Sequence, residues 1–358
     1  MMEKAFWKNR KVFITGHTGF KGSWLCLMLH AFGARVIGYA QEPPTDPNLF
    51  EIANVRSTVK TAFSDIRNRA TLKRSLLSAS PEIVIHMAAQ ALVRESYANP
   101  WETYSTNVMG TVNLLEGVRD CMSVRAVINV TTDKCYENKE WIWSYRENEP
   151  LGGFDPYSSS KACSEMVTAA YRNSFFNPEA YQTHQVALAS VRAGNVIGGG
   201  DWAKDRLIPD CIKAVMRQEK IVIRNPQAIR PWQHVFEPLT GYLMLAEKLY
   251  EKGPLFGGAW NFGPAGDDPK PVAWIAKKIS GQFGVPLAFE RTSKKERHHE
   301  ASTLRLDSTK AQQVLGWHPK WRLEKALDRT MSWYEAYRDG QDIRKICDQQ
   351  IKEYLSGE

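Results

Sequence analysis

An acid and a lysine stand side by side in T-T-D-K-C-Y, residues 131–136, directly after the apolar run A-V-I-N-V. Thr132, Asp133 and Lys134 place a hydroxyl, a carboxyl and an amine in succession. An elimination of water from an oxidised sugar needs a base for the proton beside the ketone and an acid for the departing hydroxyl, and this pair supplies both. The alternative is a strand-end salt bridge or an Asp that caps a turn, and these six residues favour neither interpretation.

A second constellation, P-Y-S-S-S-K, places Tyr157 and Lys161 four residues apart, on one face of the segment if it is helical. Tyrosine is protonated at neutral pH, but an adjacent ammonium stabilises the phenolate and lowers the pKa. Tyr157 can then take the proton of a sugar hydroxyl during its oxidation, with Thr132 as a hydrogen-bond partner. Taken alone, this common spacing favours an ordinary solvated helix face.

The glycine-rich segment G-H-T-G-F-K-G, residues 16–22, reverses that preference. It follows an apolar run and opens a helical pattern with the apolar residues Trp24, Leu25, Leu27, Met28 and Leu29. Gly16 allows a tight turn, Gly19 lets the backbone approach a pyrophosphate, and Gly22 lets helix and strand pack closely. The helix N-terminus attracts phosphate charge. The segment therefore predicts a dinucleotide-binding turn.

Apolar segments of strand length alternate with stretches of helical period. They lie at residues 11–15, 35–40, 82–89, 126–132 and 185–192. This alternation predicts an α/β fold, a Rossmann-type doubly wound parallel sheet, and continuous apolar runs suit strands buried on both faces. Ligands of such sheets bind beyond the carboxyl ends of the strands. T-T-D-K follows one of these ends, where chemistry is expected.

Several longer segments resemble the nucleotide-sugar 4,6-dehydratases of the extended short-chain dehydrogenase/reductase family. They are G-H-T-G-F-K-G-S-W-L, T-T-D-K-C-Y-E-N-K-E-W, Y-S-S-S-K-A-C-S-E, R-A-G-N-V-I-G-G-G-D-W, R-L-I-P-D, I-R-P-W-Q-H-V and L-G-W-H-P. The likeness covers nearly the whole chain and is greatest with the branch that takes a CDP-linked sugar. Relatives that act on dTDP-glucose commonly carry T-D-E where this chain has T-D-K, so the lysine is a difference of charge as well as identity.

The resemblance implies NAD as the cofactor and assigns roles to residues of both halves of the chain. Asp65 and Ile66 would contact the adenine, and M-A-A-Q would pass the ribose and diphosphate. The implied cofactor-binding set is Gly16, His17, Gly19, Phe20, Lys21, Gly22, Asp65, Ile66, Ala88, Ala89, Gln90, Asn107, Tyr157 and Lys161. The implied catalytic set is Thr132, Asp133, Lys134, Tyr157 and Lys161, and the substrate-binding set is Asn195, Arg206 and Arg230.

Two departures from the family pattern concern the cofactor. His17 stands where a small residue is usual, which predicts crowding of the diphosphate and weaker binding. The second strand ends at Gln41 without the acid that would hold a ribose hydroxyl, and Glu42 lies beyond the expected position. Since no arginine stands there for a 2′-phosphate, NAD is preferred to NADP only modestly.

The resemblance also implies a cycle without net redox change: oxidation at C4, loss of water across C5 and C6, and hydride return to C6. For this cycle Asp133 has to be protonated and Lys134 neutral. One alternative is a 4-epimerase of the same fold, for which T-D-K would be a structural accident. Another is a non-catalytic NAD-sensing protein, against which the intact Tyr157/Lys161 pair argues.

After about residue 192 the strand–helix rhythm ends, and Gly, Pro and Trp become frequent. We therefore expect an NAD-binding Rossmann domain in residues 1–192 and mainly a smaller mixed nucleotide-sugar-binding domain in residues 193–358. We also expect residues of about 235–262 to return to the first domain. The relatives lead us to expect a homodimer or homotetramer, with a role in dideoxyhexose and O-antigen synthesis.

Composition sets the remaining expectations for the 358 residues. The net charge of +8 is dispersed, which fits a solvated basic surface or a small anionic ligand better than nucleic acid. The six cysteines lack C-x-x-C spacing, and adjacent histidines in K-K-E-R-H-H-E, residues 294–300, suit a solvated loop, so no metal site is expected. Without an apolar leader or membrane-spanning stretch, we expect a cytoplasmic protein.

Overall fold

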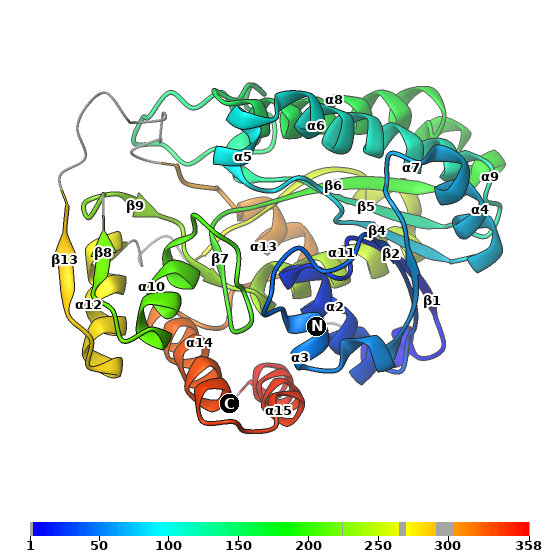
Figure 1. The fold of residues 1–358 in the computed structure, drawn as a ribbon. Coiled ribbons are helices and arrows are strands. Elements are labelled where there is room, and N and C mark those ends of the chain that lie inside the picture. Colours follow the sequence, from blue (N-terminus) through cyan, green and yellow to red (C-terminus); the bar gives the residue numbers. More distant parts are fainter. Residues whose placement is uncertain (1–2, 224, 265–269, 291–303, 358) are drawn as a thin grey trace.

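The computed structural model describes residues 3–223, 225–264, 270–290 and 304–357 (Figure 1). At its centre lies a seven-stranded sheet in which every neighbouring pair of strands is parallel. The strands are β1 (Lys11–Thr15), β2 (Arg35–Ala40), β3 (Val59–Phe63), β4 (Ile83–His86), β5 (Ala126–Val130), β6 (Ala187–Ala193) and β11 (Gly258–Phe262). The predicted Rossmann-type α/β class is confirmed.

The strand order β11-β6-β5-β4-β1-β2-β3 reverses between β1 and β4. From β1 the chain moves through β2 to β3, and it then crosses to β4 and continues in the other direction. Helices that follow these two strands leave on different sides, so a crevice opens at the carboxyl ends of β1 and β4. This crevice is where a doubly wound sheet binds its ligands.

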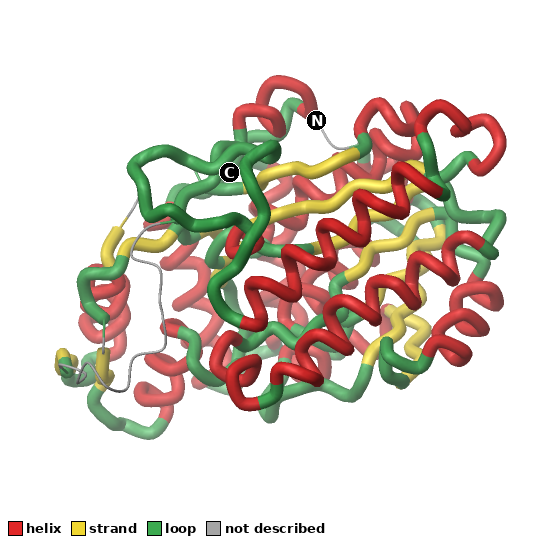
Figure 2. Tube along the Cα trace, turned by 90° about the horizontal axis from the view of Figure 1, so that it is seen from above, coloured by secondary structure: helices red, strands yellow, loops and turns green. Residues whose placement is uncertain are grey.

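Helices cover both faces of the sheet (Figures 1 and 2). On one face lie α4 (Arg69–Ala79), α5 (Val93–Ala98), α6 (Pro100–Tyr104), the π-helical turn η2 (Ser105–Met109), α7 (Gly110–Arg119) and α8 (Pro156–Ser174). On the other lie α2 (Phe20–Ala31) and α11 (Phe236–Lys252). Alternate strand residues supply the two cores: Phe13 packs with the first layer, whereas Val12 and Ile14 pack with the second.

Mixed structure with short strands follows β6 and lies beside the sheet (Figure 1). It contains β7 (Val196–Ile197), α10 (Leu207–Met216), β8 (Ile221–Ile223), β9 (Ile229–Arg230), β10 (Gln233–His234), β12 (Lys270–Pro271), α12 (Val272–Phe283), β13 (Leu287–Phe289), α13 (Thr309–Leu315), α14 (Leu323–Arg338) and α15 (Ile343–Ser356). Two elements that lie between these in the sequence pack with the central sheet. Helix α11 packs against β5 and β6, and β11 is the edge strand beside β6. The division into two domains stays a prediction.

No helix of the described chain is both long and apolar enough to cross a membrane. The remaining helical elements are short. They are α1 (Lys4–Trp7), α3 (Leu49–Ile52), η1 (Val55–Thr58), η3 (Asp133–Cys135), η4 (Pro178–Ala180), α9 (Tyr181–His184) and η5 (Gly253–Phe256).

Two strands end earlier than the apolar runs suggested. The run 82–89 leaves the sheet after His86, because the Met87 N–H donates to Thr15 O at 3.0 Å and to Thr15 Oγ1 at 3.1 Å, which turns the chain across the end of β1. The run 126–132 ends at Val130, and Thr132 caps η3 instead. Both segments are apolar enough for a strand, but they bend where the ligand crevice begins.

Candidate active site

A large cleft lies at the carboxyl ends of the strands and is lined by residues of the sheet, of its connections and of the following mixed region. Its volume is about 1990 Å³. Pockets for one small ligand commonly measure ~300–1,000 Å³, so this cleft has room for a cofactor and a second ligand together. All predicted catalytic and substrate-binding residues line it, as do all predicted cofactor-binding residues except His17 and Asn107.

The glycine-rich turn at one side of the cleft is built by close backbone contacts. Gly16 has φ of +75°, and a Cβ there would lie 2.6 Å from Ala88 N. A Cβ on Gly22 would lie 2.3 Å from Gly16 O, so only glycine lets α2 begin this close to β1. At Gly19 a Cβ would meet only Gly16 O, at 3.5 Å. The turn thus leaves an open cradle at a helix N-terminus, which fits the diphosphate of a dinucleotide.

The imidazole of His17 lies beneath this turn and not in the cleft. The side chain is fully buried, its Nε2 lies 3.0 Å from Thr61 Oγ1, and its ring packs edge-on against Phe50. Burial lowers the pKa of His17 to about 4, so the imidazole is neutral. Any effect of His17 on a bound diphosphate is therefore transmitted through the backbone of the turn rather than by direct crowding.

Asp65, at the end of β3, is held by two neighbouring side chains. Gln41 donates from Nε2 to Asp65 Oδ2 at 2.8 Å, and Arg67 donates from Nε to the same oxygen at 2.9 Å. These hydrogen bonds, mainly that from Arg67, hold the pKa of Asp65 below its ordinary value. Although no arginine follows β2 in the sequence, the fold brings Arg67 to the cleft beside Gln41. Sequence reasoning missed this contact because Arg67 lies in the turn after the next strand, β3.

Asn107 connects the cleft wall to the helix of the Tyr/Lys pair. Its Oδ1 accepts from the Gln90 N–H at 2.8 Å, and its Nδ2 donates to Gln90 O at 3.0 Å and to Ser160 Oγ at 2.8 Å. The side chain is buried and lies outside the cleft lining. Asn107 therefore fixes the backbone of M-A-A-Q against α8, which is a positioning role distinct from the cofactor contact that the resemblance implied.

Tyr157 and Lys161 lie one turn apart on α8, and both line the cleft. The helix begins here because Pro156 occupies its first position and the carboxylate of Asp155 accepts from the Ser158 N–H at 2.9 Å. Lys161 Nζ donates to Val130 O at 3.0 Å, which anchors the ammonium at the end of β5. Burial lowers the pKa of Lys161 to about 8.

The protein alone does not lower the pKa of Tyr157, contrary to the expectation from the Tyr/Lys pair. The side chain is half-buried, and burial raises the pKa of its hydroxyl to about 12. The hydrogen bond with Thr132 and the charge of Arg206 act in the opposite direction without offsetting the burial. A further positive charge is needed to form the phenolate, and the oxidised nicotinamide of a bound dinucleotide carries one.

Asp133 and Lys134 are presented by the 3₁₀ turn η3. Thr132 Oγ1 accepts from the Lys134 N–H at 3.3 Å and donates to Asp133 Oδ1 at 3.0 Å. Asp133 is only 3% exposed, and its Oδ2 has no hydrogen-bond partner within the described ranges. Burial raises the pKa of Asp133, while the charge of Lys134 opposes the shift. A raised pKa shifts a carboxyl toward the protonated form, which is the form that a general acid requires.

A buried ion pair behind η3 holds this segment in place, and sequence reasoning missed it. Arg192 Nε donates to Glu165 Oε1 at 2.9 Å, with both side chains only 3% exposed. Glu165 also accepts from Thr131 Oγ1 at 2.6 Å, and Arg192 Nη1 donates to Tyr136 Oη at 2.8 Å. The pair thus reaches both ends of T-T-D-K-C-Y. The sequence signal for this ion pair was the position of Glu165, which lies four residues after Lys161 and therefore on the same face of the helix.

The predicted substrate-binding residues line the same cleft beyond η3. Arg206 pairs with Asp201 at 2.9 Å, and the Asn195 carbonyl accepts from the Gln233 N–H at 3.0 Å. The charge of Arg230 reaches Asp133 and lowers its pKa in part. The guanidinium groups of Arg206 and Arg230 suit a diphosphate, because each guanidinium offers a forked set of hydrogen-bond donors.

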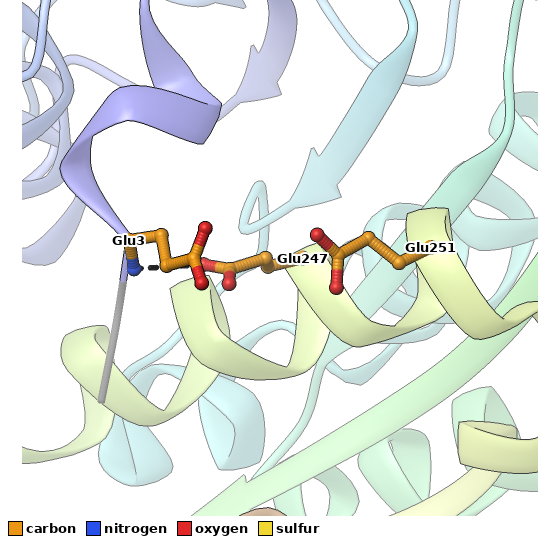
Figure 3. Close-up of side chains that lie close together, drawn as sticks. All are labelled: Glu3, Glu247 and Glu251. Atoms are coloured by element: carbon orange, nitrogen blue, oxygen red, sulfur yellow. Dashed lines mark hydrogen bonds between the residues drawn. The ribbon is translucent and has the colours of Figure 1, made fainter.

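Three carboxylates gather away from the cleft, at Glu3 and on α11 at Glu247 and Glu251 (Figure 3). Their oxygens lie within 4.8 Å of one another, and the Glu3 N–H donates to Glu247 Oε2 at 3.2 Å. Two of the three side chains are exposed, and exposed acidic groups often gather without a metal, so we assign the cluster no role. The histidines of residues 294–300 lie outside the described residues.

Fold and site together define a Rossmann-type protein with a dinucleotide-binding turn beside a Tyr/Lys pair, and the sequence comparisons give its family. Residues 12–263 match the NAD dependent epimerase/dehydratase family. Because that match covers more than half of the chain, the chain belongs to this family, whose cofactor is NAD.

Two relatives and one solved structure are similar to this chain over at least 92% of its length. The chain is 53% identical over 357 residues, 99% of both chains, to the CDP-glucose 4,6-dehydratase of Salmonella typhimurium. It is 27% identical to the UDP-glucose 4-epimerase of Halalkalibacterium halodurans, over 92% of this chain and 97% of that one. A dTDP-glucose 4,6-dehydratase from Streptomyces venezuelae, solved with NAD, has the same fold, with a TM-score of 0.77 at 24% identity over 92% of this chain and 98% of that one.

Proposed function

We propose that this protein is a CDP-glucose 4,6-dehydratase, a hydro-lyase that converts CDP-glucose to CDP-4-keto-6-deoxyglucose and water. The observation that carries the proposal is the presence of Asp133 and Lys134 in the same cleft as Tyr157 and Lys161. An alcohol oxidation needs only the second pair, whereas an elimination needs an additional acid and base. The identity of 53% over the whole length of the Salmonella enzyme supports the choice of CDP-glucose.

The first step is oxidation of the C4 hydroxyl to a ketone. Tyr157 accepts the hydroxyl proton, and Thr132, which shares a hydrogen bond with Tyr157, orients that hydroxyl. Lys161, held at Val130 O, supplies a positive charge on the same helix. When bound, NAD would supply the hydride acceptor for C4 in its oxidised form and the hydride donor for C6 in its reduced form, so the cycle has no net redox change. The glycine turn with Gly16, Gly19 and Gly22 would hold the dinucleotide.

The second step removes water across C5 and C6. The C4 ketone makes the C5 proton acidic, and Lys134 accepts that proton as the general base. The C6–O bond breaks as Asp133 gives its proton to the departing hydroxyl, which leaves as water. Burial of Asp133 favours the protonated form that this step requires. Hydride return to C6 and protonation at C5 by Lys134 then complete the 6-deoxy product.

The alternative function is a 4-epimerase of the same fold. The 27% identity to a UDP-glucose 4-epimerase supports this alternative. An epimerase returns the hydride to C4 and releases no water. The raised pKa of Asp133 favours the dehydratase, because an acid buried without a partner for Oδ2 has a use in protonating a leaving group. A non-catalytic NAD sensor would need neither pair.

Mass spectrometry after incubation with NAD⁺ tests the proposal. The purified protein is given CDP-glucose, dTDP-glucose, UDP-glucose or GDP-mannose separately, and the product is examined for loss of one water. We expect this loss with CDP-glucose. Turnover of only another sugar nucleotide would contradict the substrate. A product of unchanged mass that chromatography separates from the substrate would favour the epimerase, and stabilisation by NAD⁺ without any conversion would favour the sensor.

We further propose a homodimer or homotetramer in the cytoplasm, active in dideoxyhexose and O-antigen synthesis. Large apolar side chains exposed on adjoining helices support self-association: Trp101 is 77% exposed, Met109 51% and Met166 53%. They lie on α6, η2 and α8, which contact one another. The six free cysteines suit a reducing compartment.

A further inference from the structure

The segment that carries the proposed acid and base, residues 131–136, is held by a hydroxyl at each end, and we call it the catalytic turn. At its start, Thr131 Oγ1 donates to Glu165 Oε1 at 2.6 Å. At its end, Tyr136 Oη accepts from Arg192 Nη1 at 2.8 Å. Both side chains are buried. Because Glu165 and Arg192 form one ion pair, a single buried pair holds both ends of the turn.

This ion pair joins two regular elements, the helix α8 and the central strand β6. Arg192 donates from Nε and Nη2 to the two carboxylate oxygens of Glu165, at 2.9 and 3.1 Å. Such a forked contact fixes the orientation of both groups. Ser190 Oγ also donates to the carboxylate, at Oε2. The two end hydroxyls of the catalytic turn are therefore bound to fixed points of the scaffold.

Stability alone gives little reason for a buried ion pair at this position. Removal of two charges from water costs free energy, and well-packed apolar residues of similar volume are often equally stable. The pair does supply directed hydrogen bonds, which apolar residues lack. Catalytic side chains need such support, because they have to be held within about 0.5 Å of the productive geometry. A positioning role thus accounts for the pair better than stability does.

The carboxyl of Asp133 depends on the catalytic turn for its orientation. Its Oδ1 accepts a hydrogen bond from Thr132 Oγ1 of the same turn, at 3.0 Å. Its Oδ2 has no hydrogen-bond partner among the residues that the structure describes. Only the short 3₁₀ turn η3 lies between this carboxyl and the end of the segment at Tyr136. A displacement of either end therefore moves the proposed acid.

The two ends of the catalytic turn lie beside residues of different steps. Thr131 directly precedes Thr132, which shares a hydrogen bond with Tyr157 of the oxidation. Tyr136 lies at the opposite end, beyond the proposed base Lys134. A loosened start should therefore disturb the oxidation and the elimination, whereas a loosened end should disturb mainly the elimination.

We propose that Thr131 and Tyr136 are positioning residues of the catalytic turn. Through their hydroxyls the buried ion pair holds the acid and the base in place for the loss of water, although neither hydroxyl takes part in the chemistry. The catalytic effect rests on the proposed function. The attachment of the turn does not, because it concerns only contacts within the protein.

The first measurement needs neither cofactor nor sugar. Hydrogen exchange, followed by mass spectrometry, compares peptides that contain residues 131–136 in the parent protein and in Tyr136→Phe. We expect faster exchange in the variant, because the turn loses one of its two attachments and opens more readily. Exchange that is the same in the variant and the parent would overturn the proposal.

Tyr354→Phe is the matched control for this substitution. Tyr354 and Tyr136 are both 1% exposed, and the hydroxyl of Tyr354 donates to the charged group of Glu237, at 2.7 Å from Oε2. Tyr354 lies outside the cleft lining. The control thus loses a buried hydroxyl with a charged partner, and it should leave exchange in the catalytic turn unchanged. Exchange that rises equally in both variants would show a general loss of stability and would overturn the proposal.

The second measurement follows the two steps in a single turnover of CDP-glucose by protein loaded with NAD⁺. For Tyr136→Phe we expect water loss to slow about 10- to 100-fold, the scale of a small misplacement of catalytic groups, and NADH formation to keep roughly the parent rate. The variant leaves Glu165 in place, whose charge opposes the lowering of the pKa of Lys161 by burial. NADH should therefore persist longer than in the parent. Equal slowing of both steps would contradict the proposal.

Thr131→Val and Thr131→Ser test the other end and decide the matter if Tyr136→Phe does not fold. Valine removes the hydroxyl that donates to Glu165, and serine keeps it. We expect the valine variant to exchange faster in the turn and to slow both steps, and the serine variant to retain most of the parent's behaviour. Identical behaviour of the two variants would overturn the proposal. If the parent removes no water from CDP-glucose, the proposed function fails, and hydrogen exchange still decides how the turn is held.

Discussion

The imidazole of His17 occupies the space that any side chain at position 38 would need. A Cβ on Gly38 would lie 2.4 Å from His17 Cδ2, well inside van der Waals contact. The two residues belong to the glycine-rich turn and to β2, and the ring between them supports the turn from below. The unusual histidine in the turn and the glycine in the strand are therefore one structural feature.

Gly38→Ala should destabilise the protein by about 1–3 kcal/mol, as overpacking of a core does, and weaken NAD binding through the turn. Chemical denaturation and NAD titration measure these effects. His17→Ala in the same chain should restore much of the lost stability, because it removes the clashing ring. Gly281→Ala is the control: it lies in α12 with nothing within 4 Å of the added Cβ, so a gain of up to ~1 kcal/mol is expected. Equal losses at both glycines would contradict the link to His17.

Asp133→Asn should raise stability at pH 8 and reduce turnover by at least ~100-fold, the scale of a lost general acid. Because burial raises the pKa of Asp133 above the ordinary 3.8, the folded state binds more protons than the unfolded state between the two values. Stability therefore falls as pH rises through that window, and asparagine removes the loss. Urea unfolding at pH 4 and pH 8 checks this, with a larger gain expected at pH 8. A gain in stability of the same size at pH 4 and pH 8 would show that ionisation of the Asp133 carboxyl does not destabilise the folded protein.

Lys134→Ala should block exchange of the C5 proton with solvent more severely than it blocks hydride transfer from C4. The reason is that Lys134 is assigned to the elimination and Tyr157 to the oxidation. Deuterium incorporation at C5 and single-turnover NADH absorbance measure the two steps. Lys139→Ala, on the following loop with its ammonium 3.9 Å from Glu137, is the matched control and should alter neither. Equal turnover by Lys134→Ala and the parent would remove Lys134 from the mechanism.

Arg192→Met should cost about 3–5 kcal/mol of unfolding free energy, because it leaves the buried Glu165 carboxylate without its cation. Replacement of both partners by apolar residues should recover most of that loss. Denaturant unfolding provides the measurement. The exposed pair of Arg344 and Asp348, 3.0 Å apart, is the comparison, and Arg344→Ala should cost less than ~1 kcal/mol. A similar cost at both sites would argue against a special role of burial at Arg192.

Trp101→Lys should shift the protein toward a monomer if the apolar side chains on α6, η2 and α8 mediate self-association. A charge in an apolar interface is unfavourable unless it is paired. Size-exclusion chromatography with light scattering gives the mass of parent and variant. Leu255→Lys, at another highly exposed residue, 82%, is the control and should leave the mass unchanged. A parent protein that is already monomeric would refute the proposed oligomer.

The sequence by itself determined the parts of the site that depend on neighbours along the chain. The first two strands, residues 11–15 and 35–40, agree with the apolar runs because strands buried on both faces need an unbroken apolar stretch. The glycine turn, the helix start at Asp155 and Pro156, and the spacing of Tyr157 and Lys161 are likewise local features. The glycine turn and the alternation of strands and helices predicted the fold class, whereas the dehydratase chemistry followed from the resemblance of longer segments to a known family.

Only the tertiary structure decided the contacts and charge states of the site. Lys21 and Tyr242 are separated by 221 positions in the chain, and Glu165 and Arg192 by 27. Neither contact could therefore be predicted from the periodicity of the sequence. Nor could the pattern show that the His17 ring points inward or that burial raises the pKa of Tyr157 rather than lowering it. The physical reason is desolvation: the free energy of a charge depends on which distant side chains surround it, and packing alone fixes that environment.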